Sequence, residues 1–331
     1  MIYDSIHFMG NESKARLRIA QIASIDERVP PRKYGGPGNV VSPLTEALVA
    51  RGHEVTLFAS GDSLTSATLC FASPISVREP LTTRTTLNML NLGIAYSRAS
   101  EFDVVHDHTI DQGHPSAELV ETPVIITLHN EITPERAQLY AAFPKPTIVP
   151  ISYSQISDYP HVNTSPPIYN GIDVSKIPFG EQPDSDQFLL FVGRVDPRKG
   201  LYEAIRVAQE AGIRLKIAAK YDPFLPACKE YFDAMIKPSL DGTQTEYVGE
   251  VDAVTRNELM GKSTGVLHLN RWNEPFGLVV IEAMACGAPV IGSNKGALPE
   301  LISEGKTGFI TDSPDDAVAA VHKLGGLDRG D

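Results

Sequence analysis

Two glutamates in the second half of the chain lie eight positions apart, at Glu274 and Glu282. The apolar run GVLHLN before them predicts a buried strand, and the apolar residues from Leu278 to Ala285 predict a helix that is covered on nearly every side. A carboxylate inside such a helix is costly to bury unless it meets hydrogen-bond donors. We therefore expect Glu282 to face a ligand or an internal polar partner, close to the helix end that Glu274 precedes.

The loop between this strand and this helix has the features of an anion site. The backbone N–H groups of Phe276, Gly277 and Leu278 lie at the predicted helix N-terminus, where unpaired donors and the helix dipole stabilise a phosphate. Gly277 would let the anion approach closely. The alternative is an ordinary capped helix beside an exposed acid, but that alternative leaves the buried position of Glu282 unexplained. Two carboxylates beside a helix N-terminus are suited to binding a sugar phosphate.

A second set of charges follows another predicted strand, in FVGRVDPRKG. Arg194 can bind a diphosphate through a bidentate fork, and Lys199 can bind it as a point charge. Solvated surface charge is the usual alternative for such residues, and we assign Arg198 to the surface. Arg194 and Lys199 are the candidates for neutralising a phosphate.

The first half of the chain offers a glycine-rich loop between a predicted strand and helix. Gly35, Gly36 and Gly38 would let this loop pass close to a phosphate or a sugar, although an ordinary strand-to-helix turn has the same composition. The following helix is expected to run to Arg51, with Pro43 in its first turn because proline fits best there.

Histidines cluster at the ends of two further predicted strands, DVVHDH and VIITLHN. Open α/β sheets bind their ligands at the carboxyl ends of strands, so His106, Asp107, His108 and His129 are candidate site residues. For His106 and His108, a satisfied loop or core position explains the sequence equally well.

Composition limits the classes of function. The chain has 331 residues, of which 42% are hydrophobic and 21% charged, enough for two ordinary domains. A net charge of -12 argues against a general nucleic-acid or anionic-membrane binder. The three cysteines are far apart, which is typical of a reducing compartment without structural zinc. No signal-peptide pattern or spanning apolar run is evident, so we expect a cytoplasmic protein with at most peripheral membrane contact.

The order of predicted elements indicates an α/β protein. Strands and helices alternate along both halves, which is typical of doubly wound, Rossmann-like domains with parallel sheets. We predict an N-terminal domain over residues 1–165, a Pro-, Asn- and Gly-rich linker over 166–186 and a C-terminal domain over 187–331. Two such domains would face each other across a cleft.

The Glu-x7-Glu unit, followed by EAMACGAPVI and GALPELI, closely resembles the signature of the retaining nucleotide-sugar glycosyltransferases of family 4, which have the two-domain GT-B fold. The resemblance implies that Glu282 binds the donor ribose, and that Glu274 with the Phe276–Leu278 backbone holds the sugar and phosphates. The resemblance also implies that Arg194 and Lys199 bind the pyrophosphate. It implies that His129 lies against the donor sugar, and that the turn at Val248 and Gly249 lies near the nucleotide base.

The resemblance further implies an activity. The chain would move a hexosyl group from a UDP- or GDP-hexose to a hydroxyl of a carbohydrate, lipid or small-molecule acceptor, with His129 and Glu274 as catalytic residues and without a metal or other cofactor. Enzymes of this family usually continue past LGGLDRGD into helices that cross back over the N-terminal domain. We therefore expect weakly held closure and slow transfer.

Three other interpretations remain open on the sequence alone. A metal-dependent hydrolase could use His106, His108 and His129, together with Asp107. The DSD triplet from Asp184 to Asp186 is similar to the metal motif of GT-A glycosyltransferases, but it lies in the linker rather than after a central strand. A non-catalytic protein that binds nucleotide sugars would carry the same donor residues.

Overall fold

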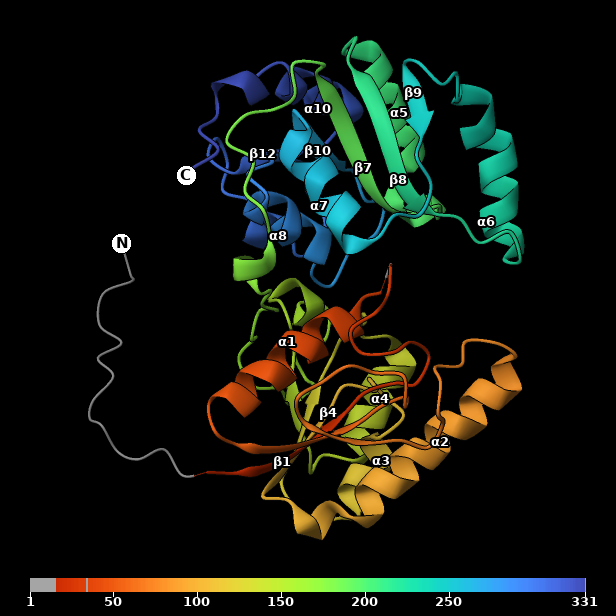
Figure 1. Ribbon diagram of the computed structural model, residues 1–331, viewed down its shortest axis with the longest axis vertical. Helices are drawn as coiled ribbons and strands as arrows, with labels where there is room; N and C mark the ends of the chain where they lie inside the picture. The colour runs from red at the N-terminus through yellow and green to blue at the C-terminus, as the bar shows by residue number, and fades with distance from the viewer. Residues whose placement is uncertain (1–15, 34, 331) are drawn as a thin grey trace, which may run out of the picture.

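The computed structural model describes residues 16–33 and 35–330. The chain forms two domains, each built on a six-stranded sheet, stacked one above the other (Figure 1). The segment between β6 (Thr147–Val149) and β7 (Phe188–Arg194) joins them. No helix in these residues is long and apolar enough to cross a membrane.

The N-terminal sheet is entirely parallel, with the strand order β3-β2-β1-β4-β5-β6. The order reverses between β1 and β4, which is the point where open α/β sheets bind ligands. The strands are β1 (Arg18–Ile22), β2 (Glu54–Phe58), β3 (Thr68–Cys70), β4 (Val104–Asp107), β5 (Val124–Thr127) and β6 (Thr147–Val149), and the helices are α1 (Pro37–Ala50), α2 (Leu81–Ser97), α3 (His114–Glu118) and α4 (Pro134–Ala142).

The C-terminal sheet repeats this topology, with the order β12-β11-β10-β7-β8-β9 and a reversal between β7 and β10. Its strands are β7 (Phe188–Arg194), β8 (Arg214–Lys220), β9 (Thr245–Tyr247), β10 (Gly265–His268), β11 (Val290–Ser293) and β12 (Gly308–Thr311). Its helices are α5 (Leu201–Glu210), α6 (Pro226–Tyr231), α7 (Ala253–Lys262), α8 (Leu278–Ala285), α9 (Leu298–Leu301) and α10 (Pro314–Val321).

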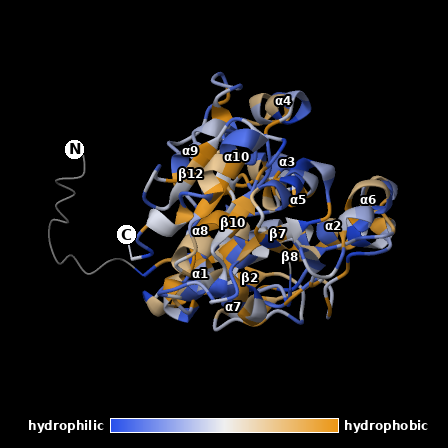
Figure 2. Cartoon of the chain, turned by 90° about the horizontal axis from the view of Figure 1, so that it is seen from above, coloured by the Kyte–Doolittle hydropathy of each residue, from blue (hydrophilic) through white to orange (hydrophobic). Residues whose placement is uncertain are grey.

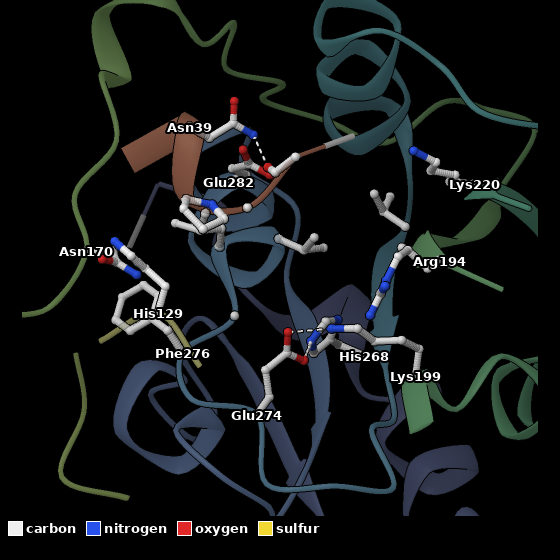
Figure 3. Close-up of a pocket in the computed structure, with 18 of the residues that line it drawn as sticks. Asn39, His129, Asn170, Arg194, Lys199, Lys220, His268, Glu274, Phe276 and Glu282 are labelled. Carbon is white, nitrogen blue, oxygen red and sulfur yellow. Dashed lines mark hydrogen bonds and ion pairs between the residues drawn. The ribbon is translucent and has the colours of Figure 1, made fainter. Parts of the chain in front are cut away.

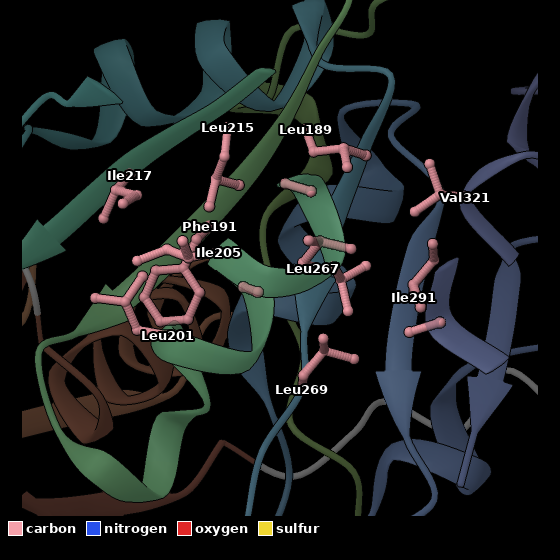
Figure 4. Close-up of a cluster of buried hydrophobic side chains, with 14 of the residues drawn as sticks. Leu189, Phe191, Leu201, Ile205, Leu215, Ile217, Leu267, Leu269, Ile291 and Val321 are labelled. Atoms are coloured by element: carbon pink, nitrogen blue, oxygen red, sulfur yellow. The ribbon is translucent and has the colours of Figure 1, made fainter. Parts of the chain in front are cut away.

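Strand β7 shows why this sheet is buried on both faces. Successive side chains of a strand point to opposite faces, and Leu189 and Phe191 pack with α5 and α10 in one apolar cluster (Figure 4). Leu190 and Val192 pack in a second cluster with α7, α8 and α9. The run FLLFV is therefore apolar without alternation. In Figure 2, hydrophobic ribbon is plain around α8 and β10.

The fold class predicted from the sequence is confirmed: both halves are doubly wound α/β domains. The prediction that Pro43 lies in the first turn of its helix is wrong. Helix α1 begins at Pro37, and Pro43 lies inside it. Pro37 occupies the start of the helix, where its missing N–H costs nothing, and the helix continues past the second proline.

Glu300 of the C-terminal domain contacts both the segment after β6 and the segment that connects the domains. The carboxylate of Glu300 in α9 accepts hydrogen bonds from the backbone N–H groups of Tyr153 (2.9 Å) and Ser154 (2.7 Å), which lie after β6. The same carboxylate accepts one from the hydroxyl of Tyr169 in the connecting segment (2.7 Å). Further along this segment, the N–H of Gly180 donates to the carbonyl of Cys286, so the chain is already packed on the C-terminal domain there.

Candidate active site in the interdomain cleft

A cleft of about 330 Å³ lies between the domains, where the carboxyl ends of the two sheets' central strands face each other. Its lining comes from both halves of the chain (Figure 3). The N-terminal side includes Gly35, Gly36, Asn39 and His129, and the C-terminal side includes Arg194, Lys199, Arg256, His268, Trp272, Glu274, Phe276, Gly277, Leu278 and Glu282.

The two predicted phosphate-binding cations both reach this cleft. Arg194 ends β7, and Lys199 ends a 3-10 turn whose N-cap is Asp196. Gly200 follows with a positive φ of 69°, and a Cβ there would meet the carbonyl oxygen of Leu269 at 1.7 Å, so only glycine allows the turn. Asp196 also accepts hydrogen bonds from Arg198, which is exposed and does not line the cleft, as its assignment to the surface predicts.

Glu274 is held by three nitrogen atoms. Lys199 Nζ lies 2.5 Å from one carboxylate oxygen, and His268 Nε2 lies 3.0 Å from the other, to which Asn270 also donates. Burial favours the neutral acid, but Lys199 and His268 outweigh it and lower the pKa of Glu274 well below its ordinary value. Glu274 is therefore a carboxylate in the free protein.

The backbone between Glu274 and α8 turns into a helix N-terminus at the cleft. Gly277 is the N-cap of α8 and has a φ of 108°, a left-handed conformation that favours glycine. Phe276 is buried, and its ring lies 5.9 Å from that of Tyr169. The helix thus begins at the wall of the cleft, with its first N–H groups at the end where an anion is stabilised.

Glu282 is 5% exposed, as its place in an apolar helix predicts, and it has an internal polar partner. Arg256 of α7 lies 2.9 Å from one of its oxygens, with the two side chains 16% and 7% exposed. Burial raises the pKa of Glu282, and Arg256 opposes this shift without cancelling it. Because both residues also line the cleft, the carboxylate can meet a ligand and its partner together.

Three predicted residues lie beside the cleft lining rather than in it. Val248 and Gly249 form the turn after β9, and the neighbouring Glu250 and Val251 line the cleft instead. Gly38 lies in the first turn of α1, where a Cβ would meet Pro31 at 2.9 Å, so its lack of a side chain serves packing.

A hydrogen-bonded network joins Gln21 of β1 to His106 in β4, to His108 after it and to the partly exposed His129 after β5. His108 Nδ1 lies 2.9 Å from His129 Nε2, and His108 Nε2 lies 2.9 Å from Gln21 Oε1. His106 contacts Thr127 at 2.8 Å. The residues of 16–33 and 35–330 contain no group of three or more His, Cys, Asp or Glu side chains arranged to hold a metal. The metal-hydrolase interpretation is therefore not favoured.

Asp107 and the DSD triplet also have other partners. Asp107 is fully buried and accepts hydrogen bonds from Tyr96 and from Thr109. Asp186 precedes β7 and pairs with Arg214, the first residue of β8, whereas the cleft lies at the carboxyl ends of these strands. The backbone N–H of Asp184 donates to the carbonyl of Lys262.

Sequence reasoning missed four residues that shape the donor side. His268 and Asn270 contact Glu274, Arg256 contacts Glu282, and the ring of Trp272 lies 5.5 Å from Lys199 Nζ. A histidine inside the apolar run GVLHLN was a usable signal, because a buried polar side chain needs a partner. Arg256 offered no signal, since its helix is of mixed composition.

Comparison with known proteins gives a consistent result. The family model "Glycosyltransferase Family 4" matches residues 34–162, and the model "Glycosyl transferases group 1" matches residues 175–325. An uncharacterized glycosyltransferase of Methanocaldococcus jannaschii is 25% identical, over 87% of this chain and 84% of its own. The glycogen synthase of Mycobacterium tuberculosis is 25% identical, over 87% of this chain and 81% of its own.

Solved structures agree. AviGT4, a glycosyltransferase involved in avilamycin A biosynthesis, is 27% identical with a TM-score of 0.68, covering 92% of this chain and 88% of its own. The sucrose-phosphate synthase of Thermosynechococcus elongatus has a TM-score of 0.76 at 19% identity, covering 95% of this chain and 91% of its own. HepE of Anabaena, solved with UDP and glucose, has a TM-score of 0.67 at 18% identity, covering 94% of this chain and 89% of its own. With two family models that span most of its length, this chain is a glycosyltransferase of the family 4 type with the GT-B fold.

Proposed function

We propose that this enzyme moves a hexosyl group from a nucleoside diphosphate hexose to an acceptor hydroxyl, with retention at the anomeric carbon and without a metal ion. One observation carries the donor assignment. Arg194 Nε is buried at the cleft and has no hydrogen-bond partner among the described residues. A buried donor without a partner is costly, and a diphosphate oxygen supplies the missing acceptor.

The positive groups around this point can replace a metal. Arg194, Lys199 and the first N–H groups of α8 line the same cleft, and each is a donor to anionic oxygens. Charge grows on the diphosphate as it leaves, so fixed donors aimed at it stabilise the transition state more than the ground state. Lys199 is paired with Glu274 in the free protein, and we propose that it shares its charge with the donor phosphate once the donor binds.

We assign the other donor-binding roles from the positions of the residues in the cleft. Glu282 would accept hydrogen bonds from the ribose hydroxyls, and Val248 to Val251 would border the base. Glu274 and His129 would meet the hexose from opposite domains. We propose UDP-hexose as the first donor to test and GDP-hexose as the second, and HepE, which holds UDP, supports this order. The acceptor would enter beside Gly35 and Gly36, as a carbohydrate, lipid or small molecule.

We propose retention because the family that the Glu-x7-Glu signature resembles is a retaining one. We propose a single front-side step because the cleft carboxylates of the described residues are paired, including Glu250, which lies 4.0 Å from Lys220 Nζ. Glu274 is held by Lys199, His268 and Asn270, and Glu282 is held by Arg256. A double displacement needs a carboxylate that can form a covalent bond to the anomeric carbon. In a single front-side step, the acceptor hydroxyl attacks on the face from which the diphosphate leaves, and its proton passes to the departing phosphate oxygen.

The decisive experiment combines binding with product analysis. Thermal-shift screening against UDP, GDP, ADP and their hexoses identifies the nucleotide, and calorimetry with and without EDTA then tests the metal. We expect the same affinity in both conditions, whereas binding that disappears with the chelator would refute metal independence. NMR of the product's anomeric proton reads the stereochemistry, and an inverted anomer would refute retention. Donor binding with neither transfer nor donor hydrolysis would favour the non-catalytic interpretation.

A further inference from the structure

Four polar residues near the switch point of the N-terminal sheet have no role in the donor site. Gln21 lies on β1 directly beside His106 on β4, and His108 follows two residues later on the same face. Thr127 ends β5, two residues before His129. Gln21 and His108 are 0% and 2% exposed, so their hydrogen bonds must be made within the protein.

The hydrogen bonds of Gln21 determine which ring nitrogens carry protons. Its amide oxygen lies 2.9 Å from His108 Nε2 and can only accept, so His108 carries its proton on Nε2. Its amide nitrogen lies 3.3 Å from His106 Nδ1 and can only donate, so His106 carries its proton on Nε2, which donates to Thr127 at 2.8 Å. This amide orientation satisfies both histidines, whereas the flipped amide would satisfy them in the opposite tautomers, so the orientation of the Gln21 amide selects the tautomer of each ring.

The same logic extends to His129. A neutral His108 with its proton on Nε2 has a bare Nδ1, and this atom lies 2.9 Å from His129 Nε2. A hydrogen bond between these two nitrogens needs one proton, which must then be on His129 Nε2. Burial lowers the pKa of His108 well below its ordinary value and that of His129 to about 3, so both rings are neutral near pH 7.

We propose that Gln21, acting through His108, holds His129 in the Nε2–H tautomer, so that the unprotonated Nδ1 of His129 accepts a hydrogen bond from a substrate hydroxyl. His129 lines the cleft and is partly exposed, and its Nδ1 makes no hydrogen bond to another described residue. Gln21 and His108 are positioning residues in this scheme. The consequence for catalysis rests on the proposed function, whereas the tautomer itself does not.

The tautomer can be read without substrate. In protein labelled with 15N-histidine, long-range 1H–15N spectra distinguish a bare Nδ1 from a protonated one, and the spectrum of His129→Asn identifies which signals belong to His129. We expect wild-type His129 to show a bare Nδ1 and Gln21→Leu to show a mixture of tautomers. A protonated Nδ1 in the wild type overturns the proposal, whether or not the protein transfers sugar.

Kinetics tests the consequence. Gln21→Leu and His108→Leu should each lower kcat by roughly 3- to 10-fold, the factor that one neutral hydrogen bond represents. Nucleotide affinity should change by less than about two-fold, because neither residue lies at the phosphates. His108→Asn returns an amide oxygen near the position of Nδ1, and it should recover most of the loss.

Thr127→Val is the matched control. It removes the hydrogen bond to His106 at the other end of the network and leaves the contacts from Gln21 through His108 to His129 in place. We expect wild-type kcat and a wild-type His129 tautomer. An equal loss of kcat in Thr127→Val, at the same melting temperature, would show that the network only supports the fold and would overturn the role of Gln21.

Discussion

Replacing Arg256 with methionine should destabilise the protein in a way that depends on pH. Arg256 lies 2.9 Å from Glu282, with side-chain exposures of 16% and 7%. Two unit charges about 4 Å apart interact by about 4 kcal/mol at an effective dielectric constant of about 20, and removing one partner of a buried pair costs roughly 3–5 kcal/mol. Because Arg256 retains some contact with water, we expect the free energy of unfolding of Arg256→Met to be lower than that of wild type by about 3 kcal/mol at pH 8.

The sign of the pH dependence follows from Glu282. Burial raises its pKa above 4.5, so the folded state holds a proton that the unfolded state releases, and this carboxyl costs stability as the pH rises through its folded pKa. Without Arg256 the pKa of Glu282 rises further. The stability gap between wild type and Arg256→Met should therefore be smaller at pH 5 than at pH 8, because it opens as the pH rises through the raised pKa of Glu282.

Thermal unfolding at pH 5 and pH 8 measures this gap. For a domain of this size, about 3 kcal/mol corresponds to a melting temperature lower by roughly 6–12 °C. Adding Glu282→Gln to Arg256→Met removes the unpaired charge and should recover most of the loss at pH 8. Arg206 and Glu210, an exposed pair 2.8 Å apart in α5, give the control, because Arg206→Met should change stability little at either pH. A loss equal at both pH values, or undiminished in the double variant, would refute the reasoning.

Three further predictions concern the cleft. Glu282→Ala should weaken nucleotide binding by roughly 1–3 kcal/mol through lost ribose contacts, with Glu282→Gln weakening it less, and calorimetry that finds no change for either would place the ribose elsewhere. His129→Ala should lower kcat far more than nucleotide affinity, because we propose that His129 contacts the sugar and not the phosphates; an equal loss in both would remove it from the catalytic set. Glu300→Ala should loosen the domain contact and widen the small-angle scattering profile while leaving nucleotide affinity intact, and a profile identical to wild type would show that Glu300 does not restrain the domains.

The fold could be predicted from the sequence because its signals are local. The run FLLFVGR is apolar without alternation and reads directly as a strand buried on both faces. The glycines that follow strands mark their turns, as Gly277 does before α8. The position of Pro43 was misjudged for the same reason: two prolines gave competing local signals for one helix start, and the structure places Pro37 there.

The candidate site was only partly predictable, because its partners come from distant segments. The apolar environment of Glu282 required a ligand or an internal partner, and the sequence did not distinguish these. Arg256 lies on a separate helix, and only the packing of α7 against α8 brings it to Glu282. His268 was visible within GVLHLN, but its contact with Glu274 depends on how the following loop folds back.

The two sheets place their chemistry at equivalent points. Each strand order reverses between the first and fourth strands of its sheet. The Gln21–His108–His129 chain lies at the reversal between β1 and β4. Arg194 and His268 end β7 and β10 at the other reversal. The donor's phosphates would be held by one domain and its sugar approached from the other. Transfer would then require the two half-sites to meet across the cleft, and the hydrogen bonds of Glu300 to Tyr153 and Ser154 are contacts between the two domains.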